Sequence, residues 1–146
     1  MVTLKYADLP GMVGRELGCS DWFALTQARI DAFANLTDDH QWIHVDVERA
    51  RREAGGTIAH GFFTLAMLSA LAGQVFQIED ASRVLNYGFN RIRFISPVPA
   101  GGRIRLSQRL AGVEAKMDGL LLTADCTVEI EGQQRPALAA EWLSLC

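Results

Sequence analysis

The sequence contains little cysteine, with three residues in 146, at positions 19, 126 and 146. An odd number at such long spacings forms neither a disulfide framework nor a zinc knuckle. No apolar run reaches the ~18–20 residues of a membrane span, and the N-terminal MVTLKYADLPG lacks the apolar core of a signal peptide. We therefore expect reduced thiols, no membrane segment and a cytoplasmic protein.

Basic residues are also scarce. The chain has 14 Lys and Arg against 17 Asp and Glu, which gives a net charge of −3. No basic surface is available to hold a nucleic acid backbone. Five arginines alternate with apolar residues, as on an exposed strand face: 91, 93, 103, 105 and 109. Low-complexity segments and internal repeats are absent, and the length and near-average composition predict a single domain over residues 1–146.

The first half of the chain predicts short helices. Residues 1–20 are loop-like, and 21–26 begin either a strand or a helix. Thr26 is a suitable N-cap for a short apolar-striped helix over 27–35. A second, charged helix over 47–54 stops at Gly55-Gly56.

Residues 57–77 predict a buried central helix. From Phe62 to Phe76 most positions are apolar or small on every side, and a helix of this kind is buried. A chain this small buries a helix on all sides only if a curved sheet wraps around it. The segment is too short to span a membrane.

The second half predicts that sheet. Alternating or β-rich residues occupy 83–95, 103–113, 120–131 and 136–145, with turn signals between them. Consecutive strands with short turns form an antiparallel meander. A helix followed by a meander is an α+β pattern.

The stretch DDHQWIH, residues 38–44, concentrates proton-handling groups in what the spacing predicts to be a bend. Asp39 and His44 are five residues apart, off the spacing that shares a helix face. Asp39 in isolation is equally consistent with a turn cap, and His44 with a core histidine. His40 and His44 have a zinc-like spacing, but no third ligand is evident, so we expect no metal site.

Three segments resemble the MaoC-like family of (R)-specific enoyl-CoA hydratases. FANLTDDHQWIHVD (33–46) is similar to its hydratase motif, with Asp39, His44 and Asp46 in register. GGTIAHGFFTLAMLS (55–69) resembles the start of its central helix, and VLNYGFNRIRFISPVPAGGRIRL (84–106) its return strand. Asp38 replaces the family's Gly and Gln41-Trp42 its Asn-Pro, which brings the motif closer to a branch similar to nodulation protein N.

The resemblance implies a hotdog fold, in which an antiparallel sheet wraps a long central helix, and a homodimer. It also implies hydration of a trans-2-enoyl-CoA to the (R)-3-hydroxyacyl-CoA, or the reverse dehydration, without metal or redox cofactor. Carried over by position, Asp39 and His44 are the catalytic pair, and the Gly61 N–H is the oxyanion donor.

Four further residues take roles by their position in the same motifs. Ser69 matches a serine that lines the family's active site. Trp42 is either a wall of the site or core filling. His60 is expected to shape the entry to the central helix, and His40 falls at a variable position and is assigned to the surface.

Two other functions fit the same fold. A hotdog thioesterase would hydrolyse the acyl-CoA bond, but such enzymes usually carry a carboxylate on the central helix, and residues 61–77 have none. A non-catalytic acyl-thioester-binding protein would use the same groove, and Asp39 and His44 would then be dispensable.

Overall fold

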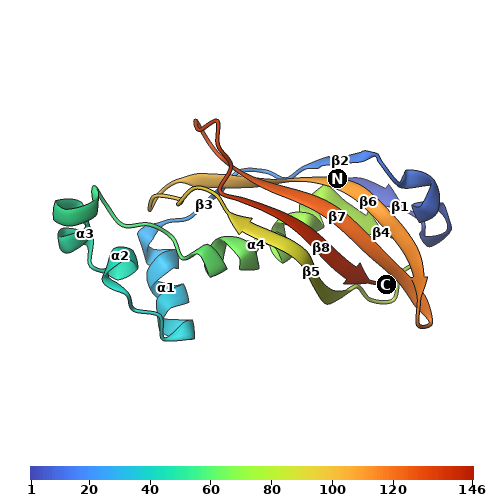
Figure 1. The fold of residues 1–146 in the computed structure, drawn as a ribbon, viewed down its shortest axis with the longest axis horizontal. Coiled ribbons are helices and arrows are strands. Elements are labelled where there is room, and N and C mark those ends of the chain that lie inside the picture. The colour runs from blue at the N-terminus through green and yellow to red at the C-terminus, as the bar shows by residue number, and fades with distance from the viewer.

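A curved, six-stranded antiparallel sheet dominates the computed structural model, which describes residues 1–146 (Figure 1). Its strands are β2 (Glu16–Cys19), β3 (Phe23–Ala24), β5 (Leu85–Phe94), β6 (Arg103–Lys116), β7 (Gly119–Ile130) and β8 (Leu138–Leu145). The order is β2-β6-β7-β8-β5, and β3 also pairs with β6. The predicted meander is therefore correct for β6 to β8 and wrong for β5.

Strand β5 lies beside β8 because its connection to β6 crosses the sheet instead of turning back. Pro97 and Pro99 keep that connection out of the sheet ladder. The connection instead bonds to the segment before the central helix, where the Ala59 N–H donates to the Val98 carbonyl and the Ala100 N–H to the Thr57 carbonyl. This leaves β5 as an edge strand.

Alternation along β6 separates a buried face from a charged one. Ile104, Leu106 and Leu110 are buried in the core. The arginines between and beside them face outward and pair across the strands with β7 and its end, as Arg103–Glu131, Arg105–Glu129 and Arg109–Asp125. The predicted exposed arginine face is confirmed for these three residues.

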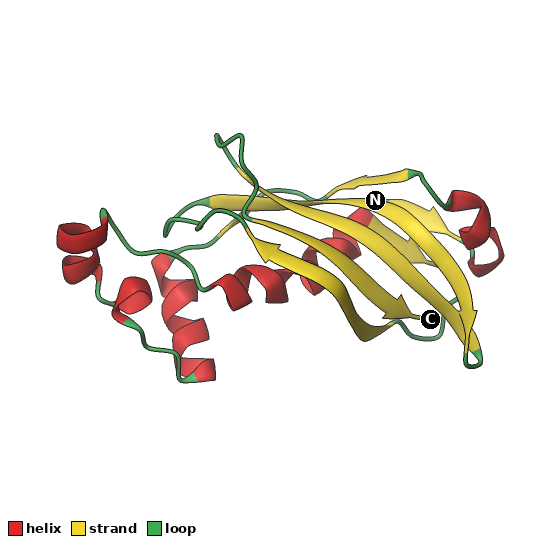
Figure 2. Cartoon of the chain, in the orientation of Figure 1, coloured by secondary structure: helices red, strands yellow, loops and turns green.

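Helix α4 (Gly61–Val75) packs under the concave face of the sheet. Phe63, Leu68, Leu71 and Val75 are buried there within a core of 24 residues. The prediction of burial on every side is wrong, because the sheet covers only one side of the helix (Figure 2). Phe62 on this helix remains 70% exposed. No helix in the structure is both long enough and apolar enough to cross a membrane.

The N-terminal segment is more regular than the loop that its glycines predict. It contains β1 (Val2–Leu4), a 3-10 helix (Tyr6–Met12) and β2. Strand β1 pairs in parallel with β4 (Phe76–Ile78), which follows α4 directly. These pairings depend on partners more than 70 residues away, so local composition gives no sign of them.

Helices α1 (Gln27–Thr37), α2 (Trp42–Val45) and α3 (Val47–Ala54) lie together beyond one end of the sheet, next to the start of α4 (Figure 1). The Thr26 side chain caps α1, as predicted. The predicted bend at 38–44 is partly wrong, because its second half is the single turn of α2.

Candidate active site

Asp39 follows a tight reversal at the end of α1. The reversal is made by Asp38, which adopts the left-handed conformation with φ 57°. This conformation strains most side chains, and glycine adopts it freely. The glycine of the family motif therefore has a conformational role that Asp38 here fulfils at some cost. The Asp39 side chain is exposed, and its Oδ1 accepts a long bond of 3.4 Å from the Gln41 N–H.

His44 lies on α2 and is 6% exposed. Its Nδ1 is 2.7 Å from the carbonyl oxygen of Ile58, and because a carbonyl only accepts, Nδ1 carries the proton. The neutral ring therefore has an unprotonated Nε2 that is available to accept a proton.

The turn that carries His44 is held in place by Gln27, at the start of α1. The Gln27 amide donates to the His44 carbonyl at 2.8 Å, and its oxygen accepts from the Thr57 hydroxyl at 2.5 Å. One side chain thus connects α1, α2 and the strand-like segment before α4. The sequence alone assigned no role to either residue, because Gln27 lies outside the three family-like segments and Thr57, although within the 55–69 segment, carries no reactive group.

His60 connects the two members of the predicted pair. It is 2% exposed, and its Nε2 donates to the backbone carbonyl of Asp39 at 3.0 Å. Its ring stacks on the His44 ring with centroids 3.9 Å apart and planes at 25°. His60 Nδ1 is buried without a partner. His60 also precedes α4 directly, so the predicted helix-entry position is where the structure places it.

Asp39, His44 and His60 bring their side-chain ligand atoms within 4.8 Å of one another. Such a trio can hold a metal only if the lone pairs converge on one point. The two imidazole planes are nearly parallel, so their nitrogen lone pairs run side by side instead of converging. The arrangement suits proton transfer better than metal binding.

The start of α4 offers free backbone donors beside this cluster. The N–H groups of Phe63 and Thr64 both bond to the His60 carbonyl, whereas those of Gly61 and Phe62 have no acceptor in the chain. A helix N-terminus also carries a partial positive charge. A cavity of about 270 Å³ lies here, with both His44 and Gly61 in its lining.

The absence of a side chain at Gly61 has a second consequence. A Cβ at this position would lie 3.0 Å from the ring of Phe94, on the edge strand. Glycine therefore allows the helix start, the cavity and β5 to meet. Phe94 also lines the cavity, and it was not singled out from the sequence.

Of the predicted site residues, only His44 and Gly61 line this cavity, and Asp39 and His60 lie outside its lining. Ser69 lines a separate, larger cavity further along α4. Trp42 lines neither cavity, and its ring packs under the Arg49 guanidinium at 4.3 Å. The expected wall role for Trp42 thus has no support in the geometry. His40 is exposed and bonds to Asn35, which agrees with its surface assignment.

The fold and these motifs define the class of protein, and the family comparison agrees. Residues 8–128 match the family model described as "MaoC like domain". The chain belongs to the MaoC-like dehydratase family, and its fold is the hotdog fold that the resemblance predicted.

Individual relatives cover nearly the whole chain. It is 47% identical over 137 residues to 3-hydroxyacyl-thioester dehydratase Z of Mycobacterium tuberculosis, covering 92% of this chain and 91% of that protein. It is 46% identical over 150 residues to nodulation protein N of Rhizobium leguminosarum bv. viciae, covering 99% and 92%. The solved (R)-hydratase of A. caviae superposes with a TM-score of 0.74 at 22% identity, covering 90% and 94%.

Proposed function

We propose that this protein adds water across the double bond of a trans-2-enoyl-CoA, giving the (R)-3-hydroxyacyl-CoA, or catalyses the reverse dehydration. Membership of a dehydratase family supports the reaction type. The observation that carries the proposal is the position of His44, which clusters with Asp39 and lines the same cavity as Gly61, the first residue of α4 with a free N–H.

In this mechanism Asp39 and His44 hold one water molecule between them. As the water oxygen bonds to C3 of the substrate, one of its protons passes to the pair. The π electrons of the double bond move toward the thioester, and C2 then receives a proton from the pair. The proton count balances, because the water supplies the hydroxyl at C3 and, through the pair, the proton at C2.

The thioester oxygen gains negative charge during this step, and in this proposal the Gly61 N–H stabilises that charge by donating a hydrogen bond to it. A preorganised backbone donor of this kind contributes about 10²–10³-fold to a rate. The reacting carbons then lie in the cavity that His44 and Gly61 line.

The first test follows the loss of enoyl-thioester absorbance with crotonyl-CoA and longer trans-2-enoyl-CoAs. We expect Asp39→Asn and His44→Asn each to lower kcat by about 10²–10⁴-fold. In the His44→Asn variant the side-chain amide occupies about the position of the histidine Nδ1. It can therefore keep the hydrogen bond to the Ile58 carbonyl, whereas the group corresponding to Nε2 is lost. His40→Asn, on the exposed side of the same segment, is the matched control and should retain full activity.

A second pair of variants tests the oxyanion donor. Gly61 is the first residue of α4, where proline is tolerated, and His60 has the extended conformation (φ −59°, ψ 137°) that precedes proline. Gly61→Pro removes the N–H, whereas Gly61→Ala introduces the same Cβ and keeps it. We expect the proline variant to be about 10²-fold slower than the alanine variant.

Equal rates in the Gly61 pair would remove this donor from the mechanism. Full activity in both Asp39→Asn and His44→Asn would overturn the catalytic pair. Tight binding of saturated acyl-CoAs without hydration of any enoyl-CoA would identify an acyl-thioester-binding protein, and release of free CoA would identify a thioesterase.

A further inference from the structure

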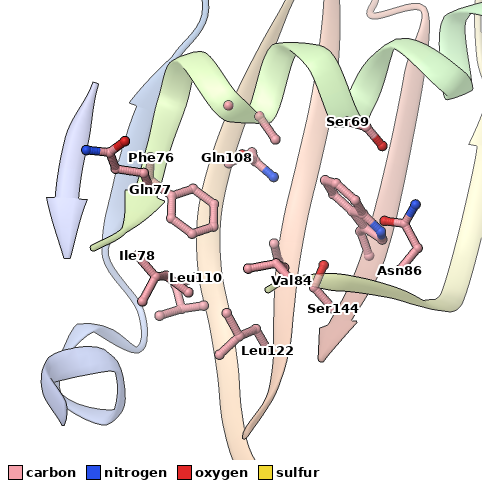
Figure 3. Close-up of a pocket in the computed structure, with 14 residues that line it drawn as sticks. Ser69, Phe76, Gln77, Ile78, Val84, Asn86, Gln108, Leu110, Leu122 and Ser144 are labelled. Atoms are coloured by element: carbon pink, nitrogen blue, oxygen red, sulfur yellow. The ribbon is translucent and has the colours of Figure 1, made fainter. Parts of the chain in front are cut away.

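A second cavity, of about 400 Å³, lies between the C-terminal half of α4 and the inner face of the sheet. Its lining is divided by polarity, as Figure 3 shows. Ser69, Asn86 and Ser144 group on one side. The other side is mostly apolar, with Phe76, Ile78, Leu110 and Leu122, and Gln77 lies there beside Phe76.

The polar side consists of groups that have no internal partners. Asn86 on β5 lies directly opposite Ser144 on β8, and Ser69 faces them from α4. None of these three side chains forms a hydrogen bond with the rest of the chain. All three are at least partly exposed, so solvent reaches this side of the cavity.

Two buried polar atoms in the same lining are also unpartnered. Gln108 is 1% exposed and Trp142 8% exposed, and Gln108 Oε1 and Trp142 Nε1 make no hydrogen bond. The other end of the Gln108 amide donates to Cys126 Sγ at 3.3 Å. Burial raises the pKa of that thiol to about 11, so it remains a neutral partner at physiological pH. The two buried atoms, Gln108 Oε1 and Trp142 Nε1, would each cost free energy if plain hydrocarbon filled the cavity, whereas solvent satisfies the three exposed side chains.

Gly61 at the candidate active site and Ser69 in this cavity lie on the same face of α4. Gly61, Leu65, Ser69 and Gly73 are spaced at four residues, so they form a continuous ridge. Ser69 lies eight residues from Gly61, or about 12 Å along the axis. An extended chain advances about 1.2 Å per covalent bond, so 12 Å corresponds to about ten bonds.

We propose that the preferred acyl chain carries a hydroxyl group near its tenth carbon, and that Ser69, Asn86 and Ser144 recognise it. This inference rests on the proposed function for the placement of the thioester at Gly61. An alkyl chain would displace water from the polar side and leave its side chains without hydrogen bonds. A hydroxyl both donates and accepts hydrogen bonds, so it can take the place of that water. The apolar side accommodates the hydrocarbon.

The test uses two unreactive probes, decanoyl-CoA and 10-hydroxydecanoyl-CoA, titrated calorimetrically into the wild-type protein. We expect the hydroxylated probe to bind about three- to tenfold more tightly, the contribution of one hydrogen bond. A 6-hydroxydecanoyl probe, whose hydroxyl does not reach Ser69, should bind no better than decanoyl-CoA.

Two variants and one control locate the preference. Asn86→Leu and Ser144→Ala should each lose most of it, while their affinity for decanoyl-CoA is kept or increased, which also shows that they are folded. Asn90→Leu, on the same strand but outside the cavity lining, should behave as wild type. Equal binding of the two decanoyl probes, a preference that ignores hydroxyl position, or binding of neither probe would each overturn the proposal.

The outcome is separable from that of the hydratase proposal, because neither probe can be hydrated. A preference for the hydroxylated probe in a protein that hydrates no enoyl-CoA supports the cavity assignment and refutes the reaction. Hydration of trans-2-decenoyl-CoA together with equal probe binding refutes the cavity assignment alone.

Discussion

At the scale of single residues, His60 makes contacts that its position in the sequence does not predict. It donates to the backbone of Asp39 and stacks on the ring of His44, so it touches both members of the proposed pair. We therefore assign it a positioning role.

This role predicts a specific kinetic pattern. His60→Phe keeps an aromatic ring against His44 but loses the bond to Asp39, so kcat should fall by about 10²-fold with little change in KM. His60→Gln places an amide N–H near the position of Nε2 and should recover part of that loss. The comparison is made in steady-state kinetics with a trans-2-enoyl-CoA over a range of pH.

The pH profiles separate positioning from proton transfer. If His60 only positions its neighbours, the Gln variant should retain both limbs of the wild-type profile. Loss of one limb in His60→Gln would show instead that His60 itself exchanges the proton.

At the scale of elements, the end of α1 is a point of local strain. Asp38 takes a left-handed conformation at the C-cap, a position that glycine occupies without steric cost. No hydrogen bond from the Asp38 side chain offsets the strain. The segment that follows carries Asp39, so a relaxed cap would change stability without removing any proposed catalytic group.

Asp38→Gly is therefore expected to increase the free energy of unfolding by about 0.5–1 kcal/mol, measured by denaturant titration. Leu36→Gly, at an exposed helical position in the same element, is the matched control. It should lower the free energy of unfolding by about 1 kcal/mol. A destabilised Asp38→Gly variant would show instead that interactions of the aspartate side chain outweigh the strain of its backbone conformation.

At the scale of the whole molecule, one side of the fold is left apolar and uncovered. Phe62 on α4 is 70% exposed and Phe94 on β5 is 53% exposed, and their rings meet edge to face at 6.1 Å. Leu85 and Tyr87, toward the other end of β5, and Val84 just before it are also exposed. An exposed apolar edge strand is a liability in a monomer.

We predict that a second copy of the chain covers this surface, forming a homodimer. Light scattering should then give twice the chain mass of 16.0 kDa. Phe62→Asp and Phe94→Asp should shift the protein toward monomer, whereas Leu36→Asp, at an 83% exposed position on α1, should not. A wild-type protein that is monomeric at micromolar concentration would contradict the prediction.

The sequence by itself determined the parts of this protein that depend on neighbouring residues. Apolar periodicity and the Thr26 cap predicted helices close to their observed bounds, and alternation predicted the long strands and the outward arginines. The resemblance to the MaoC-like family, carried over by position, made Asp39, His44 and Gly61 candidates. These features are local, because helix capping, strand alternation and motif register act over a few residues.

Only the tertiary structure decided the features that depend on chain crossings. Three features join segments 16 to 60 residues apart: the place of β5 beside β8, the Gln27 bonds that hold His44, and the stacking of His60 on His44. The exposed side of α4 likewise follows from where the sheet ends and not from the composition of the helix. Such pairings arise when distant elements pack together, and a local sequence pattern does not specify which distant element a helix or strand will contact.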